Sequence, residues 1–207
     1  SRPLKDYTDF IERMKNNHFP VKVKFGLEVC YSPGHEADIE RLKKAYPFDF
    51  LVGSIHFIDG WAFSHIEQPW KREDYDLKVL YRRYYKLMYA LADSTLFSGL
   101  AHPNSLQCFG AYPIEDYMEE YEKIADVLKK NNMYIEESSG LAINYGDMEL
   151  GMNKRMLEAM KNKKVKIVTA SDAHIPQNVG KLIPEMYDYL TKENRILHLN
   201  QNMDGFF

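Results

Sequence analysis

Short β-type runs alternate with longer amphipathic patterns along most of the chain, and this alternation limits the fold more than any other feature. The β-type runs predict strands at 21–28, 48–54, 95–101, 132–138, 165–170 and 196–199. Apolar residues at helical spacing predict helices at 6–17, 36–45, 74–93, 114–131, 152–163 and 179–190. Because repeated strand-then-helix order builds right-handed parallel units, we expect an α/β protein with a parallel sheet.

The length of the chain bears on which architecture these units build. An open doubly wound sheet and a closed barrel both fit five or six such units. A complete eight-unit barrel takes about 250 residues, whereas the chain has 207. We therefore expect one domain over residues 1–207 that is a little short for a complete barrel.

Composition and missing motifs exclude several classes of function. The formal net charge of −3 argues against bulk electrostatic capture of nucleic acid. No run approaches the ~18 apolar residues of a transmembrane helix, so we expect no membrane partner either. The two cysteines, Cys30 and Cys108, form no C-x-x-C motif, which favours a reduced, cytoplasmic setting. The chain also lacks the glycine-rich nucleotide loops and the G-x-S-x-G nucleophile motif.

Metal-ligand side chains stand where the predicted strands end. Three of the seven histidines follow predicted strands: His56, His102 and His174. Two carboxylates, Glu28 and Asp172, stand at strand ends as well. One such residue alone is more often a hydrogen-bonded surface or core group. Because parallel strands end at one edge, and imidazole and carboxylate together suit Zn, Fe or Mn, we predict a metal cluster held by all five.

Two local patterns add to this prediction. Asp172 and His174 lie two residues apart at a strand exit, so strand alternation would direct both to one face. Trp61 and Phe63 lie in the loop after His56. These aromatic side chains would either line a substrate pocket or pack against the apolar groups of their own loop, and the sequence leaves both alternatives open.

Five short motifs follow one another in a fixed order between residues 7 and 190. They are Gly-Leu-Glu at 26–28, FDFLVGSIHFIDGW at 48–61, Gly-Leu-Ala-His-Pro at 99–103, Ser-Ser-Gly-Leu at 138–141 and Ser-Asp-Ala-His-Ile-Pro at 171–176. Each motif is weak alone, but the ordered set is specific. It resembles the PHP (polymerase and histidinol phosphatase) superfamily, and within it the histidinol-phosphatase branch.

The resemblance implies a fold, a metal cluster and an activity. The fold is a distorted (β/α)7 barrel with two or three divalent metals at the carboxyl ends of its strands. Motif match makes all five residues named above metal ligands, with Asp172 and His174 also catalytic. The implied reaction is hydrolysis of a small phosphorylated substrate, L-histidinol phosphate in the named branch, which is a step of histidine biosynthesis. The alternatives are a PHP phosphoesterase for another small phosphate ester and a truncated metal-binding barrel without activity.

The chain also departs from the family pattern. The family opens with a strand that ends in His-x-His, and nothing before Glu28 offers this motif. We therefore expect two further βα units before Ser1 and a barrel that is incomplete at its N-terminal end. Asn104 and Glu137 stand where the branch usually has Asp and Asn. We expect these two residues, with Trp61, to contact substrate.

Overall fold

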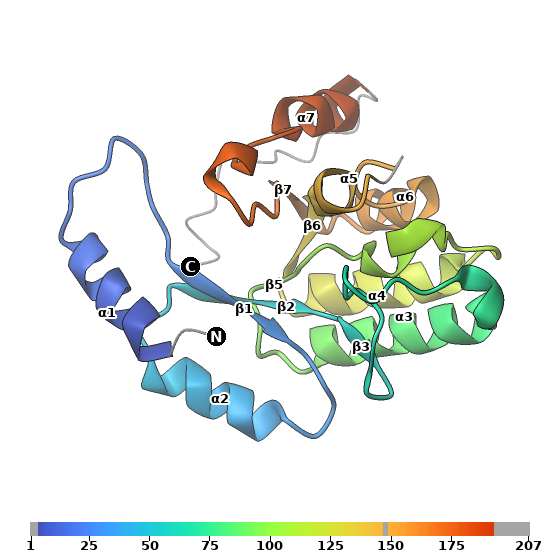
Figure 1. Ribbon diagram of the computed structural model, residues 1–207, viewed down its shortest axis with the longest axis horizontal. Helices are drawn as coiled ribbons and strands as arrows, with labels where there is room; N and C mark the ends of the chain where they lie inside the picture. The colour runs from blue at the N-terminus through green and yellow to red at the C-terminus, as the bar shows by residue number, and fades with distance from the viewer. Residues whose placement is uncertain (1–3, 147–148, 193–207) are drawn as a thin grey trace.

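The computed structural model describes residues 4–146 and 149–192, in which a twisted five-stranded parallel sheet is packed against helices (Figure 1). The strand order is β1-β2-β5-β6-β7, and every neighbouring pair is parallel. The strands are β1 (Gly26–Cys30), β2 (Phe50–Ser54), β5 (Gly99–Leu100), β6 (Tyr134–Ser138) and β7 (Lys166–Ala170). The predicted α/β class is confirmed, and the described part of the sheet is open, with β1 and β7 at its edges.

Helices form a layer along one face of this sheet. The helices of the described residues are α1 (Leu4–Lys15), α2 (Glu36–Ala45), α3 (Leu77–Asp93), α4 (Met118–Lys130), α5 (Gly140–Asn144), α6 (Lys154–Asn162) and α7 (Ile183–Lys192). Helices α3, α4 and α6 run side by side in this layer (Figure 1), and their apolar residues, with Ile39 of α2, join the sheet in one core. A side chain at position 53 would meet Leu91 at 2.8 Å, so Gly53 lets α3 pack closely on β2.

The opposite face of the sheet carries acidic side chains. Strand register pairs Glu28 with Val52, and Glu136 with Val168. Because successive side chains of a strand point to opposite faces, these residues lie on the face away from the main core. A small separate cluster of Val52, Ala101 and Tyr134 is buried on the same face. Glu28 and Glu136 share this face with the small cluster, where Glu28 is exposed and Glu136 is half-buried.

The first predicted strand is displaced in the structure. The alternation of Val and Lys predicted a strand over 21–28, but β1 spans Gly26–Cys30. Val21 is 69% exposed and Val23 is 37% exposed, so this alternation does not correspond to a buried face. Glu28 therefore lies within the strand rather than at its end, and its side chain reaches the site by pointing out of the sheet.

Other boundaries differ for identifiable reasons. The helix expected from 114 begins at Met118, because Ile114 is exposed and Asp116 accepts a hydrogen bond from the Met118 backbone N–H. The helix expected from 179 begins at Ile183, after Leu182 adopts a positive φ of 63°. The expected strand over 95–101 is reduced to Gly99–Leu100. The strand expected at 196–199 lies outside the described residues.

A hairpin between β2 and α3 was not predicted. Strands β3 (Phe57–Ile58) and β4 (Trp61–Ala62) pair antiparallel across Asp59 and Gly60, both of which have positive φ. An Asp-Gly pair with these angles is a favoured two-residue hairpin turn. Short 3-10 helices at Arg72–Asp74, Ser105–Gly110 and Pro176–Asn178 complete the described elements. No helix in the described part of the chain is both long and apolar enough to span a bilayer.

Candidate metal centre

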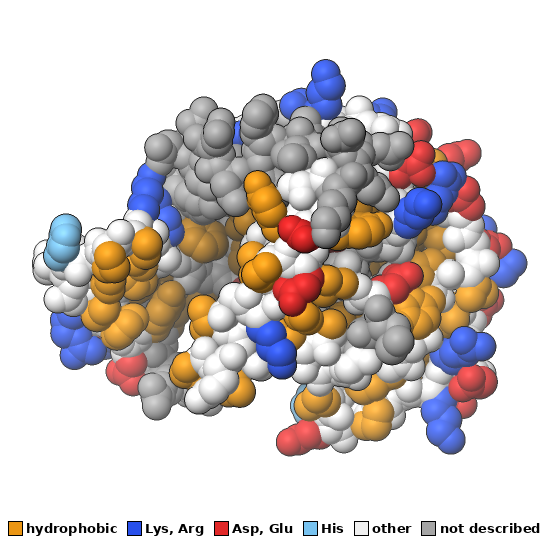
Figure 2. All heavy atoms as spheres, turned by 90° about the horizontal axis from the view of Figure 1, so that it is seen from above, with side chains coloured by type: hydrophobic (Ala, Val, Ile, Leu, Met, Phe, Trp, Pro, Cys, Tyr) orange, Lys and Arg blue, Asp and Glu red, His pale blue; other side chains and the backbone are white. Residues whose placement is uncertain are grey.

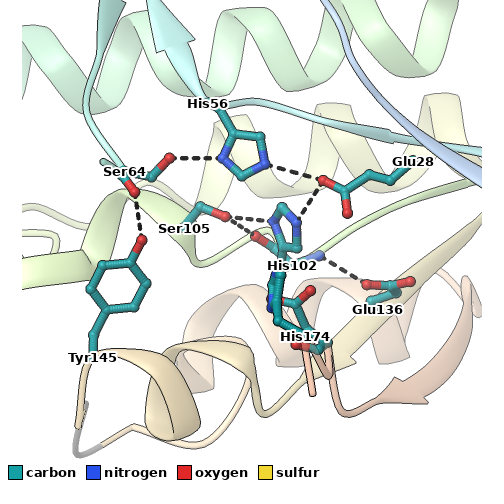
Figure 3. A network of polar contacts seen from close by, with 9 residues as sticks. Glu28, His56, Ser64, His102, Ser105, Glu136, Tyr145 and His174 are labelled. Carbon is teal, nitrogen blue, oxygen red and sulfur yellow. Dashed lines mark hydrogen bonds and ion pairs between the residues drawn. The ribbon is translucent and has the colours of Figure 1, made fainter. Parts of the chain in front are cut away.

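Three neighbouring strands bring one carboxylate and two imidazoles to a single point (Figure 3). Glu28 extends from β1, whereas His56 and His102 follow β2 and β5. Glu28 Oε1 lies 3.1 Å from His56 Nε2 and 3.1 Å from His102 Nε2. The three ligand atoms all lie within 4.8 Å of one another. Mixed nitrogen and oxygen donors at this spacing fit a divalent metal such as Zn, Fe or Mn.

Glu28 and His102 hold each other in their charged forms. Burial alone would raise the pKa of Glu28, but hydrogen bonds from His102 and His56 outweigh it and hold the pKa well below its usual value. Burial alone would lower the pKa of His102, but the facing Glu28 carboxylate raises it to about 9. In the metal-free protein, Glu28 is thus an ionised carboxylate that draws positive charge toward it.

The remaining two predicted ligands face the same cavity. Asp172 and His174 follow β7, and both line a cavity of about 530 Å³ that Glu28, His56 and His102 also line. Burial raises the pKa of Asp172, and the positive charge of His102 opposes the shift. A side chain at position 140 would approach Asp172 Oδ2 to 2.3 Å. Gly140 therefore leaves the space that the Asp172 carboxylate occupies.

The structure thus divides the five predicted residues into two groups around one cavity. Glu28, His56 and His102 form the tight cluster, and Asp172 and His174 line the same cavity outside it. Their convergence was expected from the sequence, whereas the subdivision was not. Their role as metal ligands remains a prediction.

Three polar residues around the cluster escaped sequence reasoning. Ser64 Oγ lies 2.8 Å from His56 Nδ1, and Ser105 Oγ lies 2.6 Å from His102 Nδ1. Glu136 accepts a hydrogen bond of 3.2 Å from the His102 backbone N–H, and burial raises its pKa to about 7. The spacing of Ser105 three residues after His102 was a readable signal. Ser64 reaches His56 only because the β3–β4 hairpin folds back.

The three predicted substrate contacts lie elsewhere. Trp61 stacks on Tyr75 at a centroid distance of 4.6 Å and packs edge-on against Trp70, so its loop folds on its own aromatic groups. Glu137 is fully buried on the helix-covered face and accepts a hydrogen bond from the Met152 backbone N–H. Neither side chain is among the described residues that line the cavity, and a contact with substrate stays a prediction for both.

Asn104 remains open as a substrate contact. Its side chain is 4% exposed, and neither polar atom of its amide has a hydrogen-bond partner within the described residues. It is two residues from His102 but is not among the described residues that line the cavity. A contact with substrate stays a prediction for this residue.

Apolar side chains form the walls of the cavity. Phe57 and Ile66 are 46% and 58% exposed and line one side, whereas Leu141 and Tyr145 approach from the α5 region. The Tyr145 hydroxyl donates a hydrogen bond of 2.5 Å to the Ser64 carbonyl, which ties the two sides together (Figure 3). Elsewhere on the surface, hydrophobic side chains occupy the middle of the face seen in Figure 2, with acidic groups among them.

A family model for the PHP domain matches residues 2–139, which is most of the chain. The chain belongs to the PHP family. The match includes Glu28, His56 and His102 and ends before Asp172 and His174. It confirms the resemblance that the ordered motifs indicated.

Two curated relatives of this PHP chain carry the same name. A probable histidinol-phosphatase from Deinococcus radiodurans is 28% identical over 169 residues, which cover 77% of this chain and 60% of that protein. A probable histidinol-phosphatase from Schizosaccharomyces pombe is 20% identical over 84% of this chain and 61% of that protein. The chain therefore spans about three fifths of the length of these relatives.

Two solved structures share the fold. The histidinol phosphate phosphatase of Lactococcus lactis, solved with zinc, L-histidinol and phosphate, matches with a TM-score of 0.68 at 16% identity over 93% of this chain and 74% of that one. A putative histidinol phosphatase from Listeria monocytogenes matches with a TM-score of 0.72 at 19% identity over 88% of this chain and 75% of that one. At these identities, the similarity establishes the PHP-type α/β architecture.

Proposed function

We propose that the protein is a metal-dependent phosphatase that hydrolyses L-histidinol phosphate to L-histidinol and phosphate, within histidine biosynthesis. The observation that carries this proposal is the convergence of the tight Glu28–His56–His102 cluster with Asp172 and His174 around one cavity. The names of both curated relatives support the substrate. The zinc, L-histidinol and phosphate in the Lactococcus structure support the metal and the reaction.

The five cavity residues are assigned as ligands of two or three divalent metals. Metals held there would supply positive charge for the phosphoryl group and would make a water molecule a nucleophile near neutral pH. The three histidines contribute neutral nitrogen ligands, and Glu28 and Asp172 offset the charge of the cations. Asp172 and His174 line the cavity together with the tight cluster, so a phosphate bound there would be in reach of both groups. This position gives both residues their proposed part in catalysis.

The apolar walls would bind the organic part of the ester. Phe57 and Ile66 are half exposed without substrate, so an ester that covers them removes apolar surface from water. Leu141 and Tyr145 line the cavity from the side of α5 and limit its width. Such walls also exclude water other than the nucleophile from the reacting phosphate.

Phosphate release from purified protein tests the proposal. With added Mn²⁺ or Zn²⁺, hydrolysis of L-histidinol phosphate should exceed that of simple phosphate esters at least tenfold, which corresponds to about 1.4 kcal/mol of transition-state discrimination. His102→Ala should lose both bound metal and activity, because it removes one ligand of the tight cluster. His18→Ala is the matched control, since His18 is exposed and is neither in the tight cluster nor among the described residues that line the cavity.

The outcomes separate the alternatives. Equal rates of hydrolysis on all esters would mean that the substrate is a broader class of small phosphate esters rather than histidinol phosphate. Metal binding without hydrolysis of any ester would favour a metal-binding barrel without activity. Absence of metal from the parent protein would refute the proposed function.

A further inference from the structure

We propose that Ser105 is a positioning residue that fixes the ring tautomer of His102, so that Nε2 is the nitrogen offered to a metal. This inference rests on the proposed metal-dependent function. It concerns a residue outside the predicted ligand set, and it is carried by the placement of one hydroxyl hydrogen.

The Ser105 hydroxyl has two close partners on His102. Its Oγ lies 2.7 Å from the His102 carbonyl oxygen and 2.6 Å from His102 Nδ1. A hydroxyl has one hydrogen, and a carbonyl oxygen can only accept. The hydrogen therefore points to the carbonyl, and Oγ must accept a hydrogen bond from Nδ1–H. A neutral imidazole protonated at Nδ1 carries its free lone pair on Nε2.

The opposite nitrogen of the same ring faces the tight cluster. His102 Nε2 lies 3.1 Å from Glu28 Oε1, and that oxygen also lies 3.1 Å from His56 Nε2 (Figure 3). Nε2–H donates to Glu28 in the described structure. When a metal takes the place of that proton, the tautomer that Ser105 selects directs the Nε2 lone pair to the point shared by all three ligands. The other tautomer would direct a fixed N–H to this point and the lone pair to Ser105.

The backbone around His102 reinforces this orientation. The Ser105 backbone N–H donates a second hydrogen bond, of 3.0 Å, to the His102 carbonyl oxygen. That oxygen therefore accepts from both the backbone and the hydroxyl of Ser105. His102 has a positive φ of 23°, and its own N–H is held by Glu136. These contacts hold His102 in a backbone conformation that L-residues rarely adopt, and they thereby fix the position of its ring.

Burial makes the serine hard to replace by water. Ser105 is 4% exposed and His102 is 5% exposed. Removal of the hydroxyl would leave Nδ1–H without a partner in a dry environment, which favours a tilted ring or the wrong tautomer. Ser64 occupies the equivalent place at His56, but both residues are partly exposed, so water can substitute there. We therefore expect a larger effect at Ser105 than at Ser64.

Metal affinity is the principal measurement. Ser105→Ala should weaken Zn²⁺ binding about 10- to 100-fold in a competition titration with a chromogenic chelator, the range typical of lost outer hydrogen bonds to metal ligands. Ser105→Thr keeps the hydroxyl and should restore most of the affinity. Ser98→Ala should bind as the parent does, because the hydrogen bonds described for Ser98, with Leu51 and Tyr134, are made by its backbone. Thermal unfolding of the metal-free proteins separates this effect from a loss of fold.

The tautomer itself is measured by ¹⁵N NMR of histidine-labelled, Zn²⁺-loaded parent protein, with the His102 signals assigned by their loss in His102→Gln. Protonated Nδ1 supports the inference, and protonated Nε2 overturns it even if Ser105→Ala fails to fold. Parent-like Zn²⁺ affinity in a folded Ser105→Ala protein also overturns it while leaving the proposed function intact. Failure of the parent to bind Zn²⁺ would overturn both.

Discussion

Replacement of Glu137 by glutamine should make the protein more stable at alkaline pH. Glu137 is fully buried, and Oε2 accepts a hydrogen bond of 2.9 Å from the Met152 backbone N–H. The backbone at Gly151 passes so close that a Cβ there would lie 2.3 Å from the Glu137 carboxyl carbon. Glutamine has the same shape and keeps an acceptor for Met152, but it has no charge to bury.

The size of the effect follows from the pKa of Glu137. Burial raises this pKa from 4.5 to about 8, although the nearby Lys161 opposes the shift. Because a tenfold change in proton affinity corresponds to about 1.4 kcal/mol, ionisation in the folded protein costs at most about 5 kcal/mol more than in the unfolded chain. This contribution to stability is fully present below pH 4.5 and is lost as pH rises through 8.

Chemical denaturation of parent and Glu137→Gln between pH 4 and 9 measures the effect. The free energy of unfolding of the variant minus that of the parent should rise over this interval by several kcal/mol and level off above pH 8. Glu122→Gln on the exposed side of α4 should give a flat difference. A change below about 0.5 kcal/mol between pH 5 and 8 would refute the argument that Glu137 is a buried, protonated group.

Three further changes test other parts of the structure. Gly99→Ala should destabilise the protein by about 1–3 kcal/mol in urea, because its Cβ would lie 2.3 Å from the Tyr134 ring; an unchanged midpoint would contradict this packing. Asp76→Ala should cost about 1 kcal/mol, since Asp76 caps α3 through the N–H groups of Lys78 and Val79, and Asp74→Ala serves as the comparison. His174→Ala should lower the metal content measured by elemental analysis, and parent-like content would remove His174 from the ligand set.

The order of elements and the candidate ligands were readable from the sequence. The α/β class follows from alternating periodicities, which are local properties, and α2 was predicted with the bounds that it has in the structure. The convergence of His56, His102 and Asp172 was also predictable. Parallel strands all end at one edge of their sheet, so residues that follow different strands meet there whatever the distance in sequence.

The local pattern of residue types was not sufficient to predict a strand, or the face to which a side chain points, where solvent exposure and burial decided it. The Val-Lys alternation before Gly26 suggests a strand, but exposed Val21 and Val23 show that no buried face stabilises one there. Of the adjacent Glu136 and Glu137, the sequence favoured Glu137 as a substrate contact. The strand places Glu136 near His102 and Glu137 under the helices, because neighbouring side chains point to opposite faces.

The chain's own residues therefore determined which chemical groups are available, and tertiary structure decided how they are paired. Histidine and carboxylate at strand ends are sufficient to predict a metal site, since ligand preference is a property of the side chain. Both histidines turn Nε2 toward Glu28 and Nδ1 toward a serine, and the hydroxyls of Ser64 and Ser105 reach them through a hairpin and a tight turn. Such contacts require the two atoms to be placed to within a few tenths of an ångström. Packing sets this placement, and spacing in the sequence does not.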